Sequence, residues 1–368
     1  MPVAPQAAMV MPFIGAVLRG RRSWRESLEG LRLALVMNPR VVTTRAPTRV
    51  DLGGGWTDVP PYCDREGGFV CNIAITRYAT ARLTETRHPS LVSPRVASHV
   101  GTTHDSRVPP REPLVEAAMR RSGVDDAAVS IQNDFPVGAG LGGSSAASAA
   151  VIGALLHWQD KEWDRADIAE EGRRIEVEEL GVAGGRQDHY AATHGGALGL
   201  TFTNRVEVRR IELSEAMRRD LVARATLIYT GQSRISGDTI RAVLGAYEAR
   251  EPRVLEALRR MRQLAMEMAT ALERSDLDAL GDQLREHWEH QRSLHPSIPT
   301  DHIDEIIDRS RKAGALGAKA MGASGGGCVL ILARQADGDR VRHAVRPLGQ
   351  ILEFEIDDGG LALVREKA

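Results

Sequence analysis

The chain has 368 residues, 42% of them hydrophobic and 26% charged, which is typical of a soluble globular protein with one large domain or two smaller ones. Its formal net charge of −1 argues against partners that are gathered by a global field, such as nucleic acid or an anionic membrane surface. The three cysteines form no Cys-x-x-Cys pair, and no apolar stretch approaches the roughly 20 residues that span a bilayer, so we expect a cytoplasmic protein with free thiols.

Residues 1–36 are interpreted as an N-terminal extension. A short apolar run at residues 9–18 is followed by arginines, whereas a secretory signal carries its basic residues in front of the apolar run. The extension is either a short accessory helix over residues 23–35 or upstream sequence that precedes the true start.

Strands and helices alternate in the first half of the chain. β-Branched residues between turn signals predict strands, and apolar residues at helical spacing predict helices. In chain order we expect strands over 42–49 and 68–81, strands and a polar loop over 82–108, a helix over 113–122, a strand over 127–133, and helices over 144–159, 164–180 and 187–193.

The second half begins with strands and continues with long helices. Leu258, Met261 and Leu264 follow helical spacing and indicate a core-facing stripe. Without a Rossmann fingerprint or a regular βα alternation, the pattern predicts an α+β fold of two halves that join near residue 200. We expect strands over 198–213 and 225–229, helices within 237–294 and over 302–313, a glycine loop followed by a strand over 317–332, and closing strands over 350–364.

A glycine-rich turn leads directly into an alanine-rich helix at residues 136–147, which read PVGAGLGGSSAA. Glycines let consecutive backbone N–H groups converge on one anion, and the helix adds the positive end of its dipole. The Gly-Lys-Ser/Thr ending of a Walker A loop is absent. The segment predicts a nucleotide-phosphate cradle, with an ordinary tight turn as the alternative.

Three segments, in order along the chain, resemble the motifs of the GHMP kinases, the superfamily of galactokinase, homoserine kinase, mevalonate kinase and phosphomevalonate kinase. Residues 45–58 (RAPTRVDLGGGWTD) resemble the family's N-terminal motif, residues 136–147 its ATP loop, and residues 319–329 (KAMGASGGGCV) its C-terminal glycine motif. The resemblance implies a two-domain α+β fold with the active site between the halves. The N-terminal, ATP-binding half (37–205) would be ribosomal protein S5 domain 2-like and the C-terminal half (206–368) ferredoxin-like.

The resemblance also implies the groups that would hold ATP and Mg²⁺. Magnesium prefers oxygen ligands, so Ser144 and Glu176 are the expected metal ligands, with Ser145 as the alternative to Ser144 because the register is ambiguous by one position. The residues expected to cradle ATP are Pro136, Gly138, Ala139, Gly140, Leu141, Gly142, Gly143, Ser144, Ser145 and Ala146.

Glu176 and Asp188 match the twelve-residue spacing between the metal-binding glutamate and the catalytic aspartate of the kinases that the chain resembles. Surface charge is the alternative for Glu176, and an N-cap of its own helix is the alternative for Asp188. Arg49 would hold Asp188 ionised and offset charge on the transferred phosphoryl group, or it would instead form a structural ion pair with Asp51.

The candidate substrate contacts are Gly55, Trp56, Asp58, Arg234 and Gly325. Asp58 would accept hydrogen bonds from sugar hydroxyls or merely end a turn, and Trp56 would pack on a sugar face or be buried in the core. Galactokinases have an acidic residue and a histidine where this chain has Gly55 and Trp56, which argues against galactose.

Within the family, residues 53–62 (GGGWTDVPPY), 75–79 (ITRYA) and 186–192 (RQDHYAA) resemble most the branch that phosphorylates D-glycero-D-manno-heptose 7-phosphate. We therefore expect a kinase that uses ATP and magnesium to phosphorylate the anomeric hydroxyl of that sugar, with Arg77, Arg186 or Arg234 binding its phosphate. The alternatives are an L-fucose-type sugar 1-kinase and a catalytically inactive protein that senses sugar or nucleotide. No nucleic-acid or membrane partner is expected, and a homo-oligomer is left open.

Overall fold

A computed structural model describes residues 39–86, 113–232 and 237–365 of the chain. The predicted helix over 23–35, most of the polar loop before 113, and Arg234 lie outside these described residues. No helix in the described ranges is long and apolar enough to cross a membrane.

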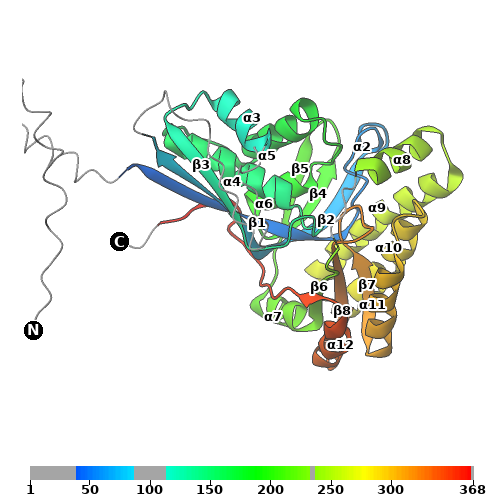
Figure 1. Cartoon of the computed structure of the whole chain (residues 1–368). Coiled ribbons are helices and arrows are strands. Elements are labelled where there is room, and N and C mark those ends of the chain that lie inside the picture. Colours follow the sequence, from blue (N-terminus) through cyan, green and yellow to red (C-terminus); the bar gives the residue numbers. More distant parts are fainter. Residues whose placement is uncertain (1–38, 87–112, 233–236, 366–368) are drawn as a thin grey trace, which may run out of the picture. The chain divides into compact units, whose positions relative to one another are not determined.

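The larger of two antiparallel sheets has the strand order β10-β1-β2-β4-β5, and β3 also pairs with β2. Helices lie against β1 and β2 from both sides, α4 and α6 on one and α9 on the other, so both strands carry long runs of buried residues (Figure 1). The strands predicted up to residue 213 are confirmed here, whereas the stretch 350–364, predicted as closing strands, contributes only two residues to this sheet. The bounds are β1 (Val41–Gly53), β2 (Gly68–Glu85), β3 (Ala127–Asn133), β4 (Ala197–Phe202), β5 (Val206–Ile211) and β10 (Ala362–Leu363).

The helices of this half are close to those expected, with two corrections. No helix is predicted at Tyr62–Glu66, where α2 forms. The helix predicted over 164–180 ends as an α-helix at Arg173 and continues as a π-helical turn, Arg174–Glu179. Such wide turns occur frequently at functional sites, and this one contains Glu176. The α-helices are α2 (Tyr62–Glu66), α3 (Pro113–Ser122), α4 (Gly143–Trp158), α5 (Arg165–Arg173) and α6 (Gln187–His194).

The smaller sheet has the strand order β7-β8-β6-β9, and helices α10, α11 and α12 pack against its strands. The apolar stripe of α9 is buried as predicted. The predicted glycine loop followed by a strand is found at residues 321–327 and in β8, but strand β7, which precedes this loop, and helices α7 and α12 were not predicted. The bounds are β6 (Ala225–Tyr229), β7 (Ala315–Ala320), β8 (Cys328–Ala333), β9 (Gln350–Ile351), α7 (Glu215–Arg224), α8 (Gly237–Glu248), α9 (Pro252–Glu273), α10 (Leu277–Ser293), α11 (Asp301–Lys312) and α12 (Gly338–Val345).

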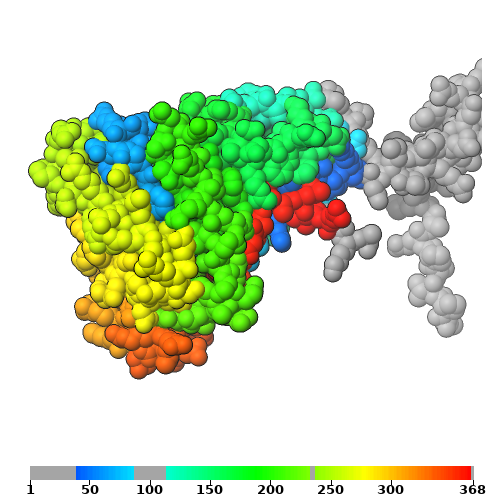
Figure 2. Space-filling view, turned by 180° about the vertical axis from the view of Figure 1, so that it is seen from behind, coloured from blue at the N-terminus to red at the C-terminus, as the bar shows by residue number. Residues whose placement is uncertain are grey.

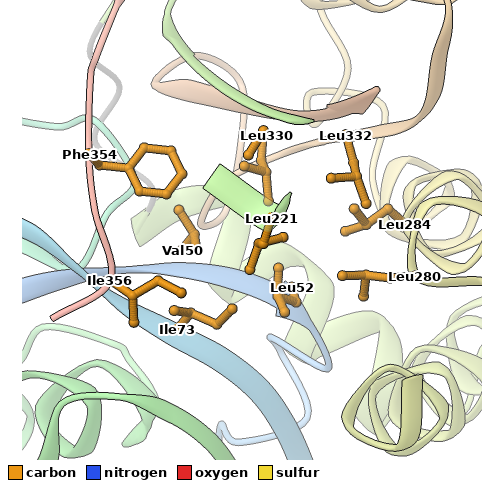
Figure 3. A pocket seen from close by; sticks show the side chains of 11 residues that line it. Val50, Leu52, Ile73, Leu221, Leu280, Leu284, Leu330, Leu332, Phe354 and Ile356 are labelled. Carbon is orange, nitrogen blue, oxygen red and sulfur yellow. The ribbon is translucent and has the colours of Figure 1, made fainter. Parts of the chain in front are cut away.

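An apolar cavity lies where the two sheets meet (Figure 3). Val50 and Leu52 of β1 face Leu330 and Leu332 of β8, and leucines of α7 and α10 close the space between them. All of these side chains belong to one buried cluster, so burial of shared apolar surface fixes the two sheets to each other. The positions of the loops that adjoin β1 and β8 are therefore fixed relative to each other.

Chain segments that are far apart in sequence also pack against each other away from the cavity. Figure 2 shows the segment around α2 beside α8, where the rings of Tyr62 and Tyr247 pack edge to face with centroids 5.3 Å apart. At the other end of the larger sheet, β10 pairs with β1.

Both sheets with their helices confirm the predicted α+β class. The predicted boundary at residue 205 falls inside the β4–β5 hairpin, whose strands pair along their length. The exact limits of the two halves, and the status of residues 1–36, remain predictions.

Candidate active site

A cavity of about 740 Å³ gathers the three glycine-rich motifs that the sequence singled out. Its volume is in the range of small-molecule sites. Most of the predicted site residues line it: Arg49, Gly55, Trp56, Asp58, Pro136, Gly138, Ala139, Gly140, Leu141, Gly142, Gly143, Ser144, Ser145, Glu176 and Asp188, together with Asp51, Gln187, Met321, Gly322, Ser324 and Gly326.

The glycines of the predicted cradle are required by its shape. Gly138, Gly140 and Gly142 have φ values of 73°, 75° and 72°, which side-chain-bearing residues rarely adopt. A Cβ on Gly140 would lie 2.8 Å from the carbonyl oxygen of Met321, and one on Gly142 would lie 3.0 Å from Cγ of Asp188. The loop therefore packs against both the C-terminal glycine motif and the predicted catalytic carboxylate.

Helix α4 begins at Gly143 with no side chain capping its first turn. Its first backbone N–H groups have no partner within the helix, and together with the helix dipole they suit an anion. The cradle therefore fits a nucleotide phosphate on the geometry of this chain alone.

Arg49 pairs with Asp188, and not with Asp51 as the alternative had it. Its Nε and Nη2 lie 2.8 Å and 2.6 Å from Asp188 Oδ1, and its Nη1 donates to the carbonyl oxygen of Gly140 at 2.7 Å. The Arg49 side chain is 4% exposed, whereas that of Asp188 is 27% exposed and borders the cavity. Arg49 thus links the cradle to a carboxylate that stays accessible.

Helix α6, which carries Asp188, is capped by a residue from another part of the chain. Asp58 Oδ2 accepts a hydrogen bond of 3.0 Å from the backbone N–H of Gln187, the first residue of that helix. Asp188 itself makes no cap hydrogen bond with its own helix. The cap alternative for Asp188 is therefore wrong, and its carboxylate is free to face the cavity.

Asp58 is fully buried, and burial raises its pKa to about 6, with Asp188 and Asp51 adding to the rise and the N–H of Gln187 opposing it. Gly185 permits this arrangement, because a Cβ there would lie 1.9 Å from Asp58 Oδ2. A buried carboxylate with a raised pKa in the wall of a cavity is a feature of functional sites.

Glu176 is buried, so the surface-charge alternative is wrong. Its carboxylate accepts hydrogen bonds from the hydroxyls of Ser144 and Ser145 and lies 2.9 Å from His189 Nε2. Burial raises the pKa of Glu176, but His189 and the two serines outweigh it, so the net shift is downward. Glu178 and Glu179 instead pair with arginines at the surface.

An ionised carboxylate beside two hydroxyls is a donor set that suits magnesium. Within the described part of the chain no three His, Cys, Asp or Glu side chains cluster as a metal site. A metal at Glu176 would accordingly take its remaining oxygens from phosphates and water. Both serines contact Glu176, so the choice between them stays open.

The remaining substrate candidates are less well supported. Trp56 lines the cavity but is 7% exposed and packs in a core cluster, and Gly325 is not in the lining and donates its N–H to the carbonyl oxygen of Ile298. Neither Arg77 nor Arg186 lines the cavity. Arg77 donates to the carbonyl oxygens of Asp134 and Glu353.

Sequence reasoning missed a buried ion pair beneath the cavity. Lys319 of β7 donates from Nζ to the backbone oxygen of Asp51 at 2.7 Å and to its Oδ2 at 3.2 Å. Burial lowers the pKa of Lys319, and Asp51 opposes that shift. The available signal was that both residues lie within the glycine motifs, one in the first and one at the start of the third.

Known proteins are similar to this chain over most of its length. The family descriptions "GHMP kinases N terminal domain" and "GHMP kinases C terminal" match residues 112–196 and 268–349. A D-glycero-alpha-D-manno-heptose 7-phosphate kinase from Campylobacter jejuni is 29% identical over 78% of this chain and 88% of its own length. A mevalonate kinase from Thermococcus onnurineus is 30% identical over 64% of this chain and 68% of its own length.

A bifunctional fucokinase/GDP-fucose pyrophosphorylase from Arabidopsis thaliana is 28% identical over 87% of this chain, which spans only 32% of that longer protein. Among solved structures, a D-glycero-D-manno-heptose 1-phosphate kinase from Bacteroides thetaiotaomicron matches with a TM-score of 0.68 at 24% identity, over 89% of this chain and 100% of that chain. At this identity the likeness concerns the fold, and it confirms the predicted two-domain architecture.

Proposed function

Because this chain belongs to the GHMP kinases, and is therefore a phosphotransferase that acts on an alcohol group, we propose that it transfers the γ-phosphoryl group of ATP to the anomeric hydroxyl of D-glycero-D-manno-heptose 7-phosphate. The similarity to the Campylobacter jejuni enzyme over most of both chains supports this substrate. The three cysteines are free and buried, which suits a reducing cytoplasm.

The observation that carries the proposal is the Arg49–Asp188 pair. Asp188 is accessible from the cavity and lies beside Gly142 of the cradle, so an acceptor hydroxyl and a phosphate bound in the cradle would meet next to it. Asp188 would orient or deprotonate the hydroxyl, and Arg49 would hold the Asp188 carboxylate in place and offset charge on the transferred group.

The cradle residues 136–146 would surround the phosphates of ATP, with donors from the backbone N–H groups of the loop and of the first turn of α4. Pro136 has no N–H, and Ala146, which does not line the cavity, donates its N–H to the carbonyl oxygen of Gly142. Ser144 and Glu176 would hold magnesium, which supplies neutralisation of phosphate charge when it is bound. His189 and the serine hydroxyls keep Glu176 ionised and in place for that task.

Gly55, Trp56 and Asp58 would contact the sugar, with Gly325 near it in the C-terminal half. An arginine would bind the 7-phosphate through a bidentate contact. Because neither Arg77 nor Arg186 lines the cavity, Arg234, which lies outside the described residues, stays the candidate for this contact. We further propose that the N-terminal half to about residue 205 binds ATP and that the C-terminal half completes the substrate side.

A second candidate substrate is L-fucose. The Arabidopsis thaliana relative, whose name includes a fucokinase, is similar over 87% of this chain. A sugar-sensing protein without turnover is a weaker candidate, because a sensor needs neither the accessible Asp188 nor the ionised Glu176.

The test is ADP release with heptose 7-phosphate, the unphosphorylated heptose, L-fucose, D-galactose and mevalonate. We expect heptose 7-phosphate to exceed the unphosphorylated heptose by roughly tenfold to over a hundredfold in kcat/KM, the size of a buried charge-assisted contact. A preference for L-fucose would make fucose the substrate in place of heptose 7-phosphate. Absence of ADP release with every sugar would overturn the proposed function.

A further inference from the structure

The carboxylate of Asp51 has one oxygen that nothing else in the protein binds. Asp51 is 3% exposed and its Oδ2 is tied to Lys319, whereas its Oδ1 has no hydrogen-bond partner among the described residues. Buried polar atoms are almost always paired, so an orphaned carboxylate oxygen in the wall of a cavity indicates a missing donor.

A second residue in the lining of the same cavity also has an orphaned acceptor. Gln187 is 7% exposed, and its Oε1 also lacks a partner among the described residues. A Cβ on Gly55 would lie 2.4 Å from Asp51 Oδ2 and 3.1 Å from Gln187 Nε2, so both side chains pack closely against Gly55 through their other polar atoms. Gly55 lines the same cavity, and the missing side chain leaves this corner to the two polar groups.

The charges around this corner select the chemistry of its ligand. Lys319 is fully buried and already engaged by Asp51, so its ammonium is not presented to the cavity. Asp51 and Asp58 bring carboxylates, and carboxylate oxygens only accept hydrogen bonds when they are ionised. A ligand with hydroxyl donors would satisfy these acceptors, whereas a carboxylate or phosphate placed here would be repelled.

We infer that Asp51 Oδ1, together with the Gln187 side chain, forms a hydroxyl-binding subsite that recognises a ring hydroxyl of the sugar. The inference rests on the proposed function, because it takes the acceptor to be a sugar. It makes Asp51 a specificity-determining residue, while Lys319 contacts only the backbone oxygen and the other carboxylate oxygen of Asp51. It also places the sugar's own phosphate away from Gly55, on another wall of the cavity.

The test is a thermodynamic cycle in which one step changes a side chain of the protein and the other removes a hydroxyl group from the sugar. The variant is Asp51→Asn, which keeps the size of the side chain and a group for Lys319 to contact. The probes are heptose 7-phosphate and its 2-, 3- and 4-deoxy analogues, or L-fucose and its deoxy analogues if fucose is the sugar that turns over. For the wild type we expect one deoxy analogue to lose roughly tenfold or more in kcat/KM, as for loss of a hydrogen bond to a charged group.

In Asp51→Asn this discrimination should shrink to less than about threefold, while the KM for ATP stays within about twofold, because the ligand group and its partner are then both missing. The matched control is Lys319→Met, which breaks the same buried pair from the side away from the cavity. It should lower the melting temperature as Asp51→Asn does but keep discrimination against the same analogue.

A merely structural role for Asp51 would reduce kcat/KM for the parent sugar and its analogues by one common factor. That result, or equal loss of discrimination in both variants, would overturn the inference. If Lys319→Met does not fold, the Asp51→Asn cycle decides alone. If the wild type turns over no sugar, the proposed function itself is wrong. If Asp51→Asn turns over the sugar with undiminished discrimination, only the subsite is rejected.

Discussion

Asp58 caps the helix of Asp188 across 129 residues of sequence, through a hydrogen bond from the backbone N–H of Gln187 to Asp58 Oδ2. The loop that carries one predicted substrate carboxylate therefore positions the helix that carries the predicted catalytic one. Disturbing Asp58 should affect both binding and chemistry, whereas disturbing Asp188 should affect chemistry alone.

Replacing Asp58 by Asn should change the pH dependence of stability. The folded-state pKa of Asp58 is about 6, above the ordinary value of 3.8, so the native state holds this proton more tightly than the unfolded chain. Stability from this group is therefore complete below pH 3.8 and falls as the pH rises through 6. Asn keeps an acceptor for the Gln187 N–H and removes the titration.

The free energy of unfolding of Asp58→Asn relative to wild type should accordingly rise by about 1 kcal/mol between pH 5 and pH 8. Urea denaturation at several pH values measures this difference. Parallel stability profiles for the two proteins would contradict the buried, ionised Asp58, and kcat/KM for the sugar should fall in the variant regardless.

Asp188→Asn should lower kcat by about a hundredfold or more, in the range for loss of a general base, while affinity for ADP changes little. The cap from Asp58 and the contact of Arg49 with Gly140 do not involve the Asp188 carboxylate, so the fold should survive. Steady-state kinetics and ADP calorimetry check this, and near-normal turnover in the folded variant would refute the assigned role.

Glu176→Gln should raise the magnesium concentration needed for half-maximal rate, because the lost charge lies where the metal would bind. Glu178→Gln is the matched control, since Glu178 has a side chain that is 61% exposed and pairs with Arg173 at the surface. Mn²⁺ binding followed by electron paramagnetic resonance in the presence of ADP gives a readout other than activity. Equal metal titrations for the two variants would show that Glu176 is not the magnesium ligand.

Gly185→Ala should impair the enzyme without adding or removing any charge. The new Cβ would lie 1.9 Å from Asp58 Oδ2, so Asp58 must move and α6 loses its cap. We expect a loss of about 1 kcal/mol or more in unfolding free energy, the usual effect of losing a cap, and a lower kcat. The neighbouring Gly184→Ala has open space at its Cβ and should behave as wild type in thermal melts and kinetics; equal behaviour of the two variants would contradict the cap.

The sequence alone determined the parts that depend on local chemistry. The glycines at 138, 140 and 142 indicated a cradle, because only glycine readily adopts the backbone conformation found there. The residue patterns at 113–122 and 127–133 predicted a helix and a strand with the observed bounds. The three motifs in order indicated the family. Periodicity did not reveal the π-helical turn at Glu176, since a widened turn changes hydrogen bonding more than residue pattern.

Only the tertiary structure decided which charged groups are partners. Asp51 lies two positions from Arg49 and was the nearer choice along the chain, yet Arg49 pairs with Asp188 and Asp51 with Lys319, 139 and 268 residues away from their respective partners. Those pairs form because the cradle, α6 and β7 meet at the end of β1. Such meetings depend on how the two sheets bury their shared apolar surface, which no local pattern of residues encodes.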